Sequence, residues 1–280
     1  MSPKDWSHER TTQEYERVIK GLQYTIGARD RLKALWVLSA RMLNEVDGLT
    51  ISKIMRLAAT SNAERFQDIF ALLISGAKKG GFFVEFGACD GVTASNTKNL
   101  EDHFNWSGIL AEPGRVWHKD LQENRSCAID FRCVSSETGS ELEFFEAKSA
   151  NVSSLDRRHE FIGEINSSYK VQTVSLLDLL RDLDAPTYID FMSIDCEGHE
   201  HDVLKAFDFD AYRFGFICVE QHASTPVERR VDPLLEAAGY EVLFPRDPRP
   251  PRMQVSGEDL MFVPKGSPFA GIHEEVWRSK

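Results

Sequence analysis

The stretch FFVEFGACDG, residues 82–91, decides the fold class of this chain of 280 residues. It begins with a short apolar run, Phe82–Phe86, and a turn with two glycines, Gly87 and Gly91, follows at once. Continuous apolar runs of this length are typical of strands that are buried on both faces of a parallel sheet. Glycine lets the backbone turn tightly and lets a ligand approach it closely. We therefore expect a ligand site at the carboxyl end of this strand.

Similar apolar runs recur along the chain, with amphipathic stretches of helical character between them. Repeated strand, helix, strand order predicts an α/β fold with a mainly parallel sheet and right-handed crossovers. The last two runs are expected to form a closing antiparallel pair, and the Pro-rich loop between them is either a solvated connection or a cover over a ligand. The expected strands are 82–86, 108–111, 127–134, 188–194, 214–219, 240–244 and 259–263.

Residues 1–80 differ in character from the rest of the chain, because their apolar positions recur at helical spacing. Thr50 and Asn62 are the expected N-caps of two of the helices. We expect an N-terminal helical extension that serves packing or homo-oligomerisation, with a lid over the substrate as the alternative. Residues 81–280 are then the second domain.

Composition narrows the class of partner and the compartment. The chain has 33 Lys and Arg residues against 44 Asp and Glu residues, which gives a net charge of -11 and makes nucleic acid an unfavourable partner. Its five cysteines form neither a CxxC pair nor a regular spacing, which favours reduced thiols. No apolar run approaches the roughly 20 residues of a membrane span. We expect a cytoplasmic protein without a membrane span.

Acidic residues follow the first two expected strands. Glu85 and Asp90 flank the glycine turn, which lacks the GxGxxG pattern of dinucleotide sites, so a cationic sulfonium fits there better than a diphosphate. Glu112 follows Gly91 by about 20 residues, the spacing of the carboxylate that accepts hydrogen bonds from ribose hydroxyls in nucleotide-binding sheets. Pro113 then ends the strand. The pattern predicts nucleoside binding.

Several motifs make the chain resemble the SAM-dependent methyltransferases of the FkbM type. They include VEFGACDGVTASNT from Val84, LAEP from Leu110 and IDFMSIDCEGHEHDVLKAF from Ile189, of which the last is the most specific. The resemblance covers roughly residues 82–265 and leaves the helical extension outside. The chain departs from the family pattern at Ser193, where the family often has lysine.

The resemblance implies a class I methyltransferase with a Rossmann-like sheet of seven strands, one of them antiparallel. It also implies methyl transfer from SAM to a hydroxyl oxygen of a small molecule, such as a sugar or a secondary metabolite. By position, SAM would contact the loop after the first strand, the end of the second strand and the turn after the third. The expected cofactor-binding residues are Glu85, Gly87, Ala88, Cys89, Asp90, Gly91, Glu112, Pro113, Ser135 and Ser136.

Transfer to an alcohol needs a group that takes up the hydroxyl proton. Asp195, Glu220 and His222 stand at the ends of two neighbouring expected strands and are the candidate catalytic residues. We favour His222 or Asp195 as the base. The same three side chains are also candidate ligands of a divalent cation such as Mg²⁺, which would lower the pKa of the acceptor.

Two other functions stay open at this point. A NAD-dependent oxidoreductase could use a similar sheet, although the acidic turn without GxGxxG disfavours it. A non-catalytic SAM-binding scaffold could use the helical extension to recruit a partner.

Overall fold

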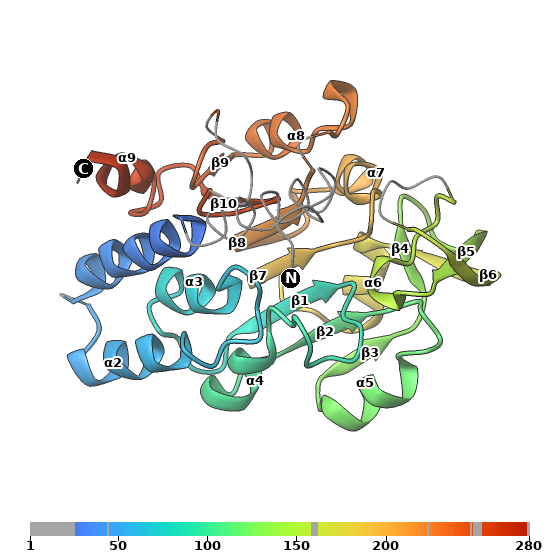
Figure 1. Ribbon diagram of the computed structural model, residues 1–280, viewed down its shortest axis with the longest axis horizontal. Coiled ribbons are helices and arrows are strands. Elements are labelled where there is room, and N and C mark those ends of the chain that lie inside the picture. Colours follow the sequence, from blue (N-terminus) through green and yellow to red (C-terminus); the bar gives the residue numbers. More distant parts are fainter. Residues whose placement is uncertain are drawn as a thin grey trace, which may run out of the picture.

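The computed structural model describes residues 26–43, 45–157, 162–222, 224–246, 248 and 254–278. A seven-stranded sheet lies at its centre, with the strand order β3-β2-β1-β7-β8-β10-β9 (Figure 1). Neighbouring strands from β3 to β8 are parallel, whereas β10 is antiparallel to both β8 and β9. The expected α/β fold with a mainly parallel seven-stranded sheet is confirmed. Its strands are β1 (Phe82–Phe86), β2 (Ser107–Ala111), β3 (Ala128–Asp130), β7 (Tyr188–Ile194), β8 (Arg213–Glu220), β9 (Tyr240–Val242) and β10 (Asp259–Pro264).

Helices cover both faces of this sheet. Side chains alternate along a strand, so Phe83 packs in the apolar cluster on one face and Val84 in the cluster on the other. Because both faces are buried, the strands read as continuous apolar runs. The first face is covered by α3 (Gln67–Ile74), α4 (Lys98–Phe104) and α5 (His118–Asn124), and the second by α6 (Leu176–Asp182), α7 (Glu200–Ala206) and α8 (Asp232–Ala237).

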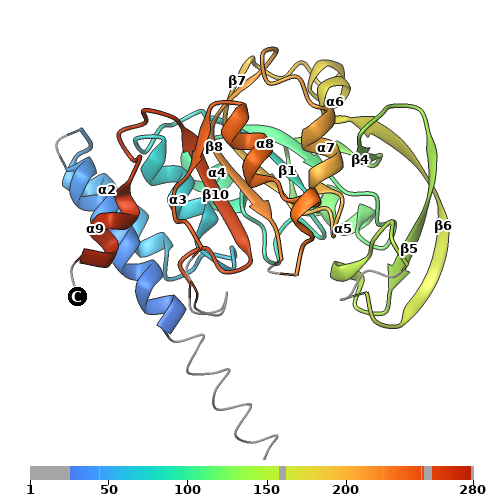
Figure 2. The ribbon, with the colours of Figure 1, turned by 90° about the horizontal axis from the view of Figure 1, so that it is seen from above.

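The N-terminal part of the described chain is helical, as expected. A helix over residues 26–42 and α2 (Gly48–Leu57) lie beside the C-terminal helix α9 (Ile272–Arg278) at one end of the molecule (Figure 2). Two expected caps are wrong. Asp47 caps α2 by accepting hydrogen bonds from two backbone amides, and α3 begins at Gln67, after Phe66 in the left-handed conformation.

A second, three-stranded sheet of order β4-β6-β5 projects from the other end of the molecule (Figure 2). It corrects the expected strand over residues 127–134, which is divided into β3 and β4. Asp130 accepts a hydrogen bond from the backbone amide of Arg132 and pairs with its guanidinium, so the chain turns between the two strands. The sheet consists of β4 (Cys133–Ser135), β5 (Glu141–Ala147) and β6 (Ile165–Ser175). A 3-10 turn, η1 (Ala150–Val152), follows β5. A second 3-10 turn, η2 (Val227–Arg229), lies between β8 and α8.

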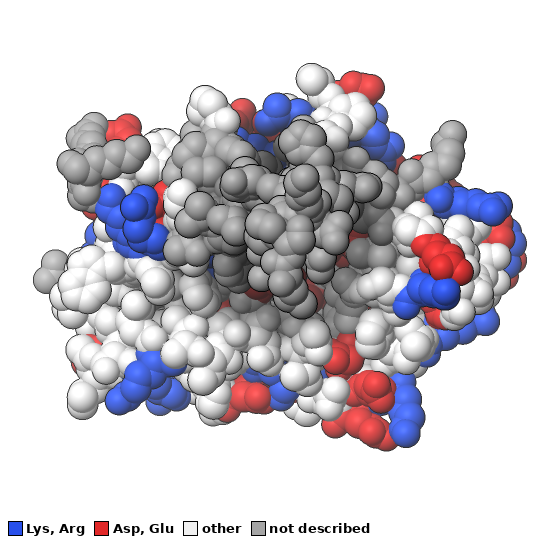
Figure 3. All heavy atoms as spheres, viewed as in Figure 1, with Lys and Arg blue, Asp and Glu red and all other residues white. Residues whose placement is uncertain are grey.

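The distribution of charged side chains on the surface and the state of the cysteines agree with what the composition predicts. Basic and acidic side chains are interspersed on the face that Figure 3 shows. All five cysteines are free thiols. Within the described residues, no helix combines the length and apolarity that a membrane span needs. The first 25 residues and the middle of the Pro-rich loop, residues 247 and 249–253, lie outside the described part.

Candidate functional site

A cavity of about 290 Å³ lies at the carboxyl ends of β1, β2, β7 and β8. Its wall also includes η1 with the loop after it, and a segment of the N-terminal extension, residues 64–67. Of the predicted site residues, the cavity is lined by Glu85, Gly87, Ala88, Cys89, Glu112, Pro113, Asp195 and Glu220. Asp90, Gly91, Ser135, Ser136 and His222 are not among its lining residues.

Gly87 brings the end of β1 directly against the end of β7. Its φ angle is 72°, in the left-handed region, and a Cβ atom at this position would lie 2.2 Å from the backbone oxygen of Asp195. Only glycine combines this backbone conformation with so close an approach. The glycine that was read from the sequence as a turn residue therefore sets the distance between two strand ends.

Glu85 holds the loop that follows the glycine turn. Its Oε1 accepts a hydrogen bond from the backbone amide of Asn96 (2.7 Å), and its Oε2 accepts from Ser95 Oγ (3.2 Å) and Thr97 Oγ1 (2.5 Å). Although Glu85 lines the cavity, both of its oxygens are thus engaged with the protein. Its carboxylate shapes the loop.

Asp90 organises the turn and does not line the cavity. Its Oδ1 accepts hydrogen bonds from the backbone amides of Val92 (2.9 Å) and Thr93 (2.7 Å), and its Oδ2 accepts from Thr93 Oγ1 (2.7 Å). Partial burial acts to raise the pKa of Asp90, but these hydrogen bonds outweigh it and lower the pKa below its ordinary value.

Glu112 points its carboxylate into the first turn after β1. Its Oε2 accepts a hydrogen bond from the backbone amide of Cys89 (2.9 Å), and its Oε1 accepts from the amide of Gly114 (2.6 Å). Burial raises the pKa of Glu112 to about 7, although the two amides act in the opposite direction. The two hydrogen bonds fix the carboxylate in place at the wall of the cavity.

Ser135 and Ser136 do not form the turn after the third strand of the main sheet. That turn follows Asp130, because β3 ends there and Ser135 pairs with Ser175 in the second sheet. The second sheet reaches the cavity through other residues, namely Cys133, Val134 and Phe144. The strand boundary that supported the expected contact of the two serines with a ligand is therefore wrong, and the contact itself stays a prediction.

Acidic side chains gather at the ends of β7 and β8. Asp195 follows β7, and its Oδ1 is buried without a hydrogen-bond donor among the described residues. Burial, followed by the neighbouring carboxylates of Glu220 and Glu197, raises the pKa of Asp195. Asp259 lies against the same group, and Gln67 Nε2 donates to its Oδ2 (2.5 Å). A cationic ligand would favour the ionised forms of these carboxyl groups and be attracted to them.

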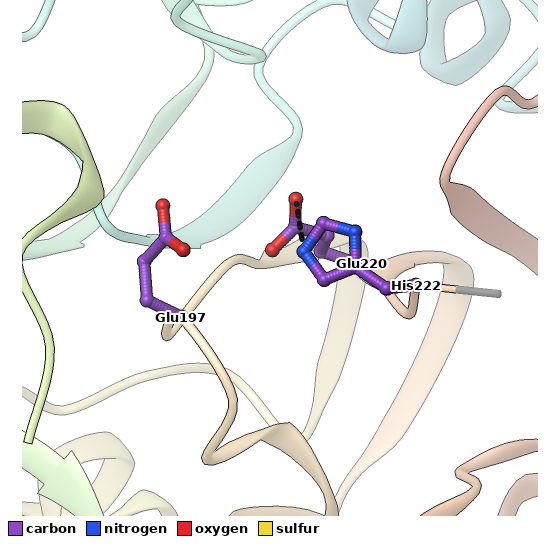
Figure 4. A group of neighbouring side chains, drawn as sticks. All are labelled: Glu197, Glu220 and His222. Carbon is purple, nitrogen blue, oxygen red and sulfur yellow. Dashed lines mark ion pairs between the residues drawn. The ribbon is translucent and has the colours of Figure 1, made fainter. Parts of the chain in front are cut away.

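His222 lies between two carboxylates. Its Nε2 is 3.4 Å from Glu220 Oε1, an ion pair drawn in Figure 4, and its Nδ1 is 3.8 Å from Glu258 Oε2. These two partners raise the pKa of His222 to about 10. The ring is therefore protonated at neutral pH and has no lone pair for a proton, so the geometry does not favour His222 as the base.

Glu197 joins this group from the turn after β7. Its φ angle is 49°, an unusual conformation for a residue with a side chain, and such strain is often found at functional positions. Its side chain lies beside those of Glu220 and His222 (Figure 4). Burial and the carboxylates of Glu220 and Glu200 raise the pKa of Glu197 to about 8.

The donor atoms form two groups with metal-ligand spacing. In each, one donor atom per residue lies within 4.8 Å of the others: Glu197 with Glu220 and His222, and Asp195 with Glu200 and Glu220. The predicted ligands Asp195, Glu220 and His222 are thus distributed over both groups, with Glu220 common to them. In the first group His222 would have to lose its proton, and in the second Glu200 Oε1 already accepts from the amides of Cys196 and Gly198.

Several residues of the site were not found from the sequence. Arg65 and Gln67 come from the helical extension, Asn96 and Arg125 act at the loop after β1, and Glu197 sits in a strained turn. Asn96 and Glu197 lie inside motifs that were recognised, so the motifs indicated their neighbourhood. No local pattern indicated Arg65, Gln67 or Arg125; Gln67 and Arg125 bind side chains that are distant in sequence.

A glycine turn, a fixed carboxylate and an acidic cavity at one edge of a mainly parallel sheet define an α/β protein that binds its ligand at the strand ends. A profile of the methyltransferase FkbM domain matches residues 85–242, more than half of the chain. The chain belongs to this family of methyltransferases, which confirms the resemblance seen in the sequence. The family assignment supports SAM as the methyl donor.

Other comparisons add little to this assignment. A similar solved structure is the crystal structure of a SAM-dependent methyltransferase from Aquifex aeolicus, with 14% sequence identity and a TM-score of 0.33 over 76% of this chain and 95% of that one. A comparison with curated protein sequences gives no match.

Proposed function

We propose that this protein transfers a methyl group from SAM to a hydroxyl oxygen of a small molecule, such as a sugar or a secondary metabolite, on a class I methyltransferase fold. The observation that carries the proposal is the juxtaposition, around one cavity, of the glycine turn, the clamped carboxylate of Glu112 and the unpartnered oxygen of Asp195. The first two features suit a nucleoside, and the third faces the place where an acceptor can lie.

Glu112 is the residue that we assign to the ribose. Two backbone amides hold its oxygens, and each oxygen keeps a further lone pair for a ribose hydroxyl. Gly87, Ala88 and Cys89 would lie against the methionine part of SAM, while Glu85, Asp90 and Gly91 give the loop its shape. The adenine contact is left unassigned, because Ser135 lies in the second sheet.

Asp195 is the residue that we assign as the base. Burial and nearby carboxylates make its ionised form a stronger base than an ordinary aspartate. A bound sulfonium would favour that ionised form, since an opposite charge nearby lowers the pKa of a carboxyl group. The hydroxyl proton would pass to Asp195 while the oxygen takes the methyl group in line with the leaving sulfur. Glu220 would form part of the acidic wall of the site, and His222 would keep Glu220 in place through their ion pair.

A divalent cation such as Mg²⁺ remains a second proposal for the same wall. The mixed set Glu197, Glu220 and His222 offers carboxylate oxygens and an imidazole nitrogen within reach of one ion. When bound, such an ion would lower the pKa of an acceptor hydroxyl. Dialysis against a chelator distinguishes the two proposals, because catalysis by Asp195 alone needs no metal.

The decisive experiment has two steps. Calorimetry first measures the affinity for S-adenosylhomocysteine, the product of every SAM-dependent transfer. A metabolite extract is then incubated with the protein and methyl-labelled SAM, with and without chelator, and labelled products are identified by mass spectrometry. A labelled ether is expected. Label on nitrogen or carbon would contradict O-methylation, and binding without product in any extract would favour a scaffold.

The role of the N-terminal extension is also a proposal. Leu32 and Trp36, one turn apart on helix 26–42, are 51% and 71% exposed, which suits homo-oligomerisation through this helix. At the same time, Glu64, Arg65 and Gln67 line the cavity, which suits a contribution of the extension to the acceptor site.

A further inference from the structure

Arg125, the residue after α5, is a buried charged side chain that the fold alone does not explain. Its guanidinium is fully buried and makes four hydrogen bonds, with helix α4 and with the loop that precedes it. Nε donates to Glu101 Oε2 (2.5 Å), Nη1 donates to Gly91 O (3.1 Å) and Ser95 Oγ (3.2 Å), and Nη2 donates to Thr97 Oγ1 (2.8 Å). Three of these four contacts are with residues 91–97.

The burial of this charge is compensated locally. Glu101 forms an ion pair with the guanidinium, Glu85 Oε2 lies 3.7 Å from Nη1, and the ring of Phe83 lies 5.4 Å from the guanidinium carbon. A buried charge is tolerated only when it is paired and hydrogen-bonded. The arrangement thus has one guanidinium shared by two carboxylates, and Glu85 binds the same loop through the hydroxyls of Ser95 and Thr97, which Arg125 also contacts.

The loop 91–97 depends on these side chains because it has little backbone structure of its own. It contains neither helix nor strand, and Ala94 has a φ angle of 56°. Glu85 binds it at residues 95, 96 and 97, and Arg125 binds it at 91, 95 and 97. The loop is therefore held by a neighbouring pair of side chains, an acid from β1 and a base from the end of α5.

This loop is a wall of the cavity, whereas Arg125 is not. Thr93, Ala94, Ser95 and Asn96 line the cavity. A Cβ atom at position 91 would lie 2.6 Å from Arg125 Cγ, so the glycine at this position accommodates the arginine side chain. Gly91 thus accommodates the packing of Arg125, and its expected contact with a ligand stays a prediction.

We propose that Arg125 is a positioning residue that holds loop 91–97 in the shape required for binding SAM. The proposal rests on the proposed function, because it assigns the cavity to SAM. Arginine is suited to the task because its rigid fork donates to several acceptors at once, whereas lysine carries the same charge on a single nitrogen. The role is one of geometry: lysine can keep the ion pair with Glu101, but it cannot reach Gly91, Ser95 and Thr97 together.

Calorimetry with S-adenosylhomocysteine on the full chain tests the proposal. Arg125→Lys should weaken binding by about tenfold to a hundredfold, since two or more hydrogen bonds to a charged group are lost. Thr97→Val, which removes one acceptor of Arg125 and one donor to Glu85 and keeps the shape of the side chain, should weaken it by about tenfold. Arg213→Lys, at an exposed ion pair with Asp210, is the matched control and should bind like the wild type.

Hydrogen exchange separates positioning from a general loss of stability. In Arg125→Lys, the amides of residues 91–97 should exchange faster in the ligand-free protein while those of β1 and β7 keep their protection, and saturating ligand should slow the loop again. Unchanged affinity in Arg125→Lys and in Thr97→Val would overturn the inference. So would faster exchange throughout the sheet. If Arg125→Lys does not fold, Thr97→Val decides alone. A wild-type protein without affinity would instead refute the SAM site itself.

Discussion

Replacing Gly87 with alanine tests the contact between the ends of β1 and β7. The left-handed conformation at this position costs an alanine about 1–2 kcal/mol relative to glycine. The new Cβ atom would also lie 2.2 Å from Asp195 O, closer than real Cβ contacts allow, and the shift of two strand ends adds about 1–3 kcal/mol. We therefore expect Gly87→Ala to lower the free energy of unfolding by about 2–5 kcal/mol.

Gly139→Ala is the matched control for this prediction. Gly139 has a φ angle of 89°, but a Cβ atom there would meet nothing within 4 Å, so only the conformational cost of about 1–2 kcal/mol applies. The loss of unfolded-state entropy is the same in both variants and cancels in their difference. Urea unfolding followed by circular dichroism measures both values. If Gly87→Ala loses no more stability than Gly139→Ala, the close approach of the two strand ends is refuted.

Three further changes test the site and the extension. Glu112→Ala should weaken the binding of S-adenosylhomocysteine by at least about tenfold in calorimetry, because a charged acceptor for ribose hydroxyls is lost; unchanged affinity would remove Glu112 from the site. His222 has a folded-state pKa of about 10 against 6.5 without its partners, so its contribution to stability is complete below pH 6.5 and is lost as the pH rises towards 10. Urea midpoints of His222→Gln should therefore vary less than those of the wild type between pH 7 and 10, and parallel curves would contradict this. Trp36→Ser should shift an oligomer towards monomer in light scattering after gel filtration, whereas a wild type that is already monomeric would refute association through this helix.

Much of the sheet and the position of the site could be read from the sequence. The bounds of β1 and β7 are those expected, because buried parallel strands are apolar throughout and end at glycine or acidic residues. Glu112 was found by its distance from the glycine turn, and the acids after β7 and β8 by the strands that precede them. These features are local in sequence, and the rule that parallel strands present their carboxyl ends at one edge brings them together.

Only the tertiary structure decided which of these residues face the cavity and what state they are in. Arg125, whose partners Gly91 and Glu85 are 34 and 40 positions away, has no local pattern that reveals it. The protonation of His222 depends first on Glu220, which is close in sequence, and then on Glu258, a residue beyond the Pro-rich loop. The second sheet was not predicted, because β6 alternates polar and apolar residues and is not one of the continuous apolar runs from which the strands were predicted. Periodicity and turn chemistry determine an element from its neighbours in sequence, whereas buried charges and strand partners depend on contacts that form only when distant segments pack together.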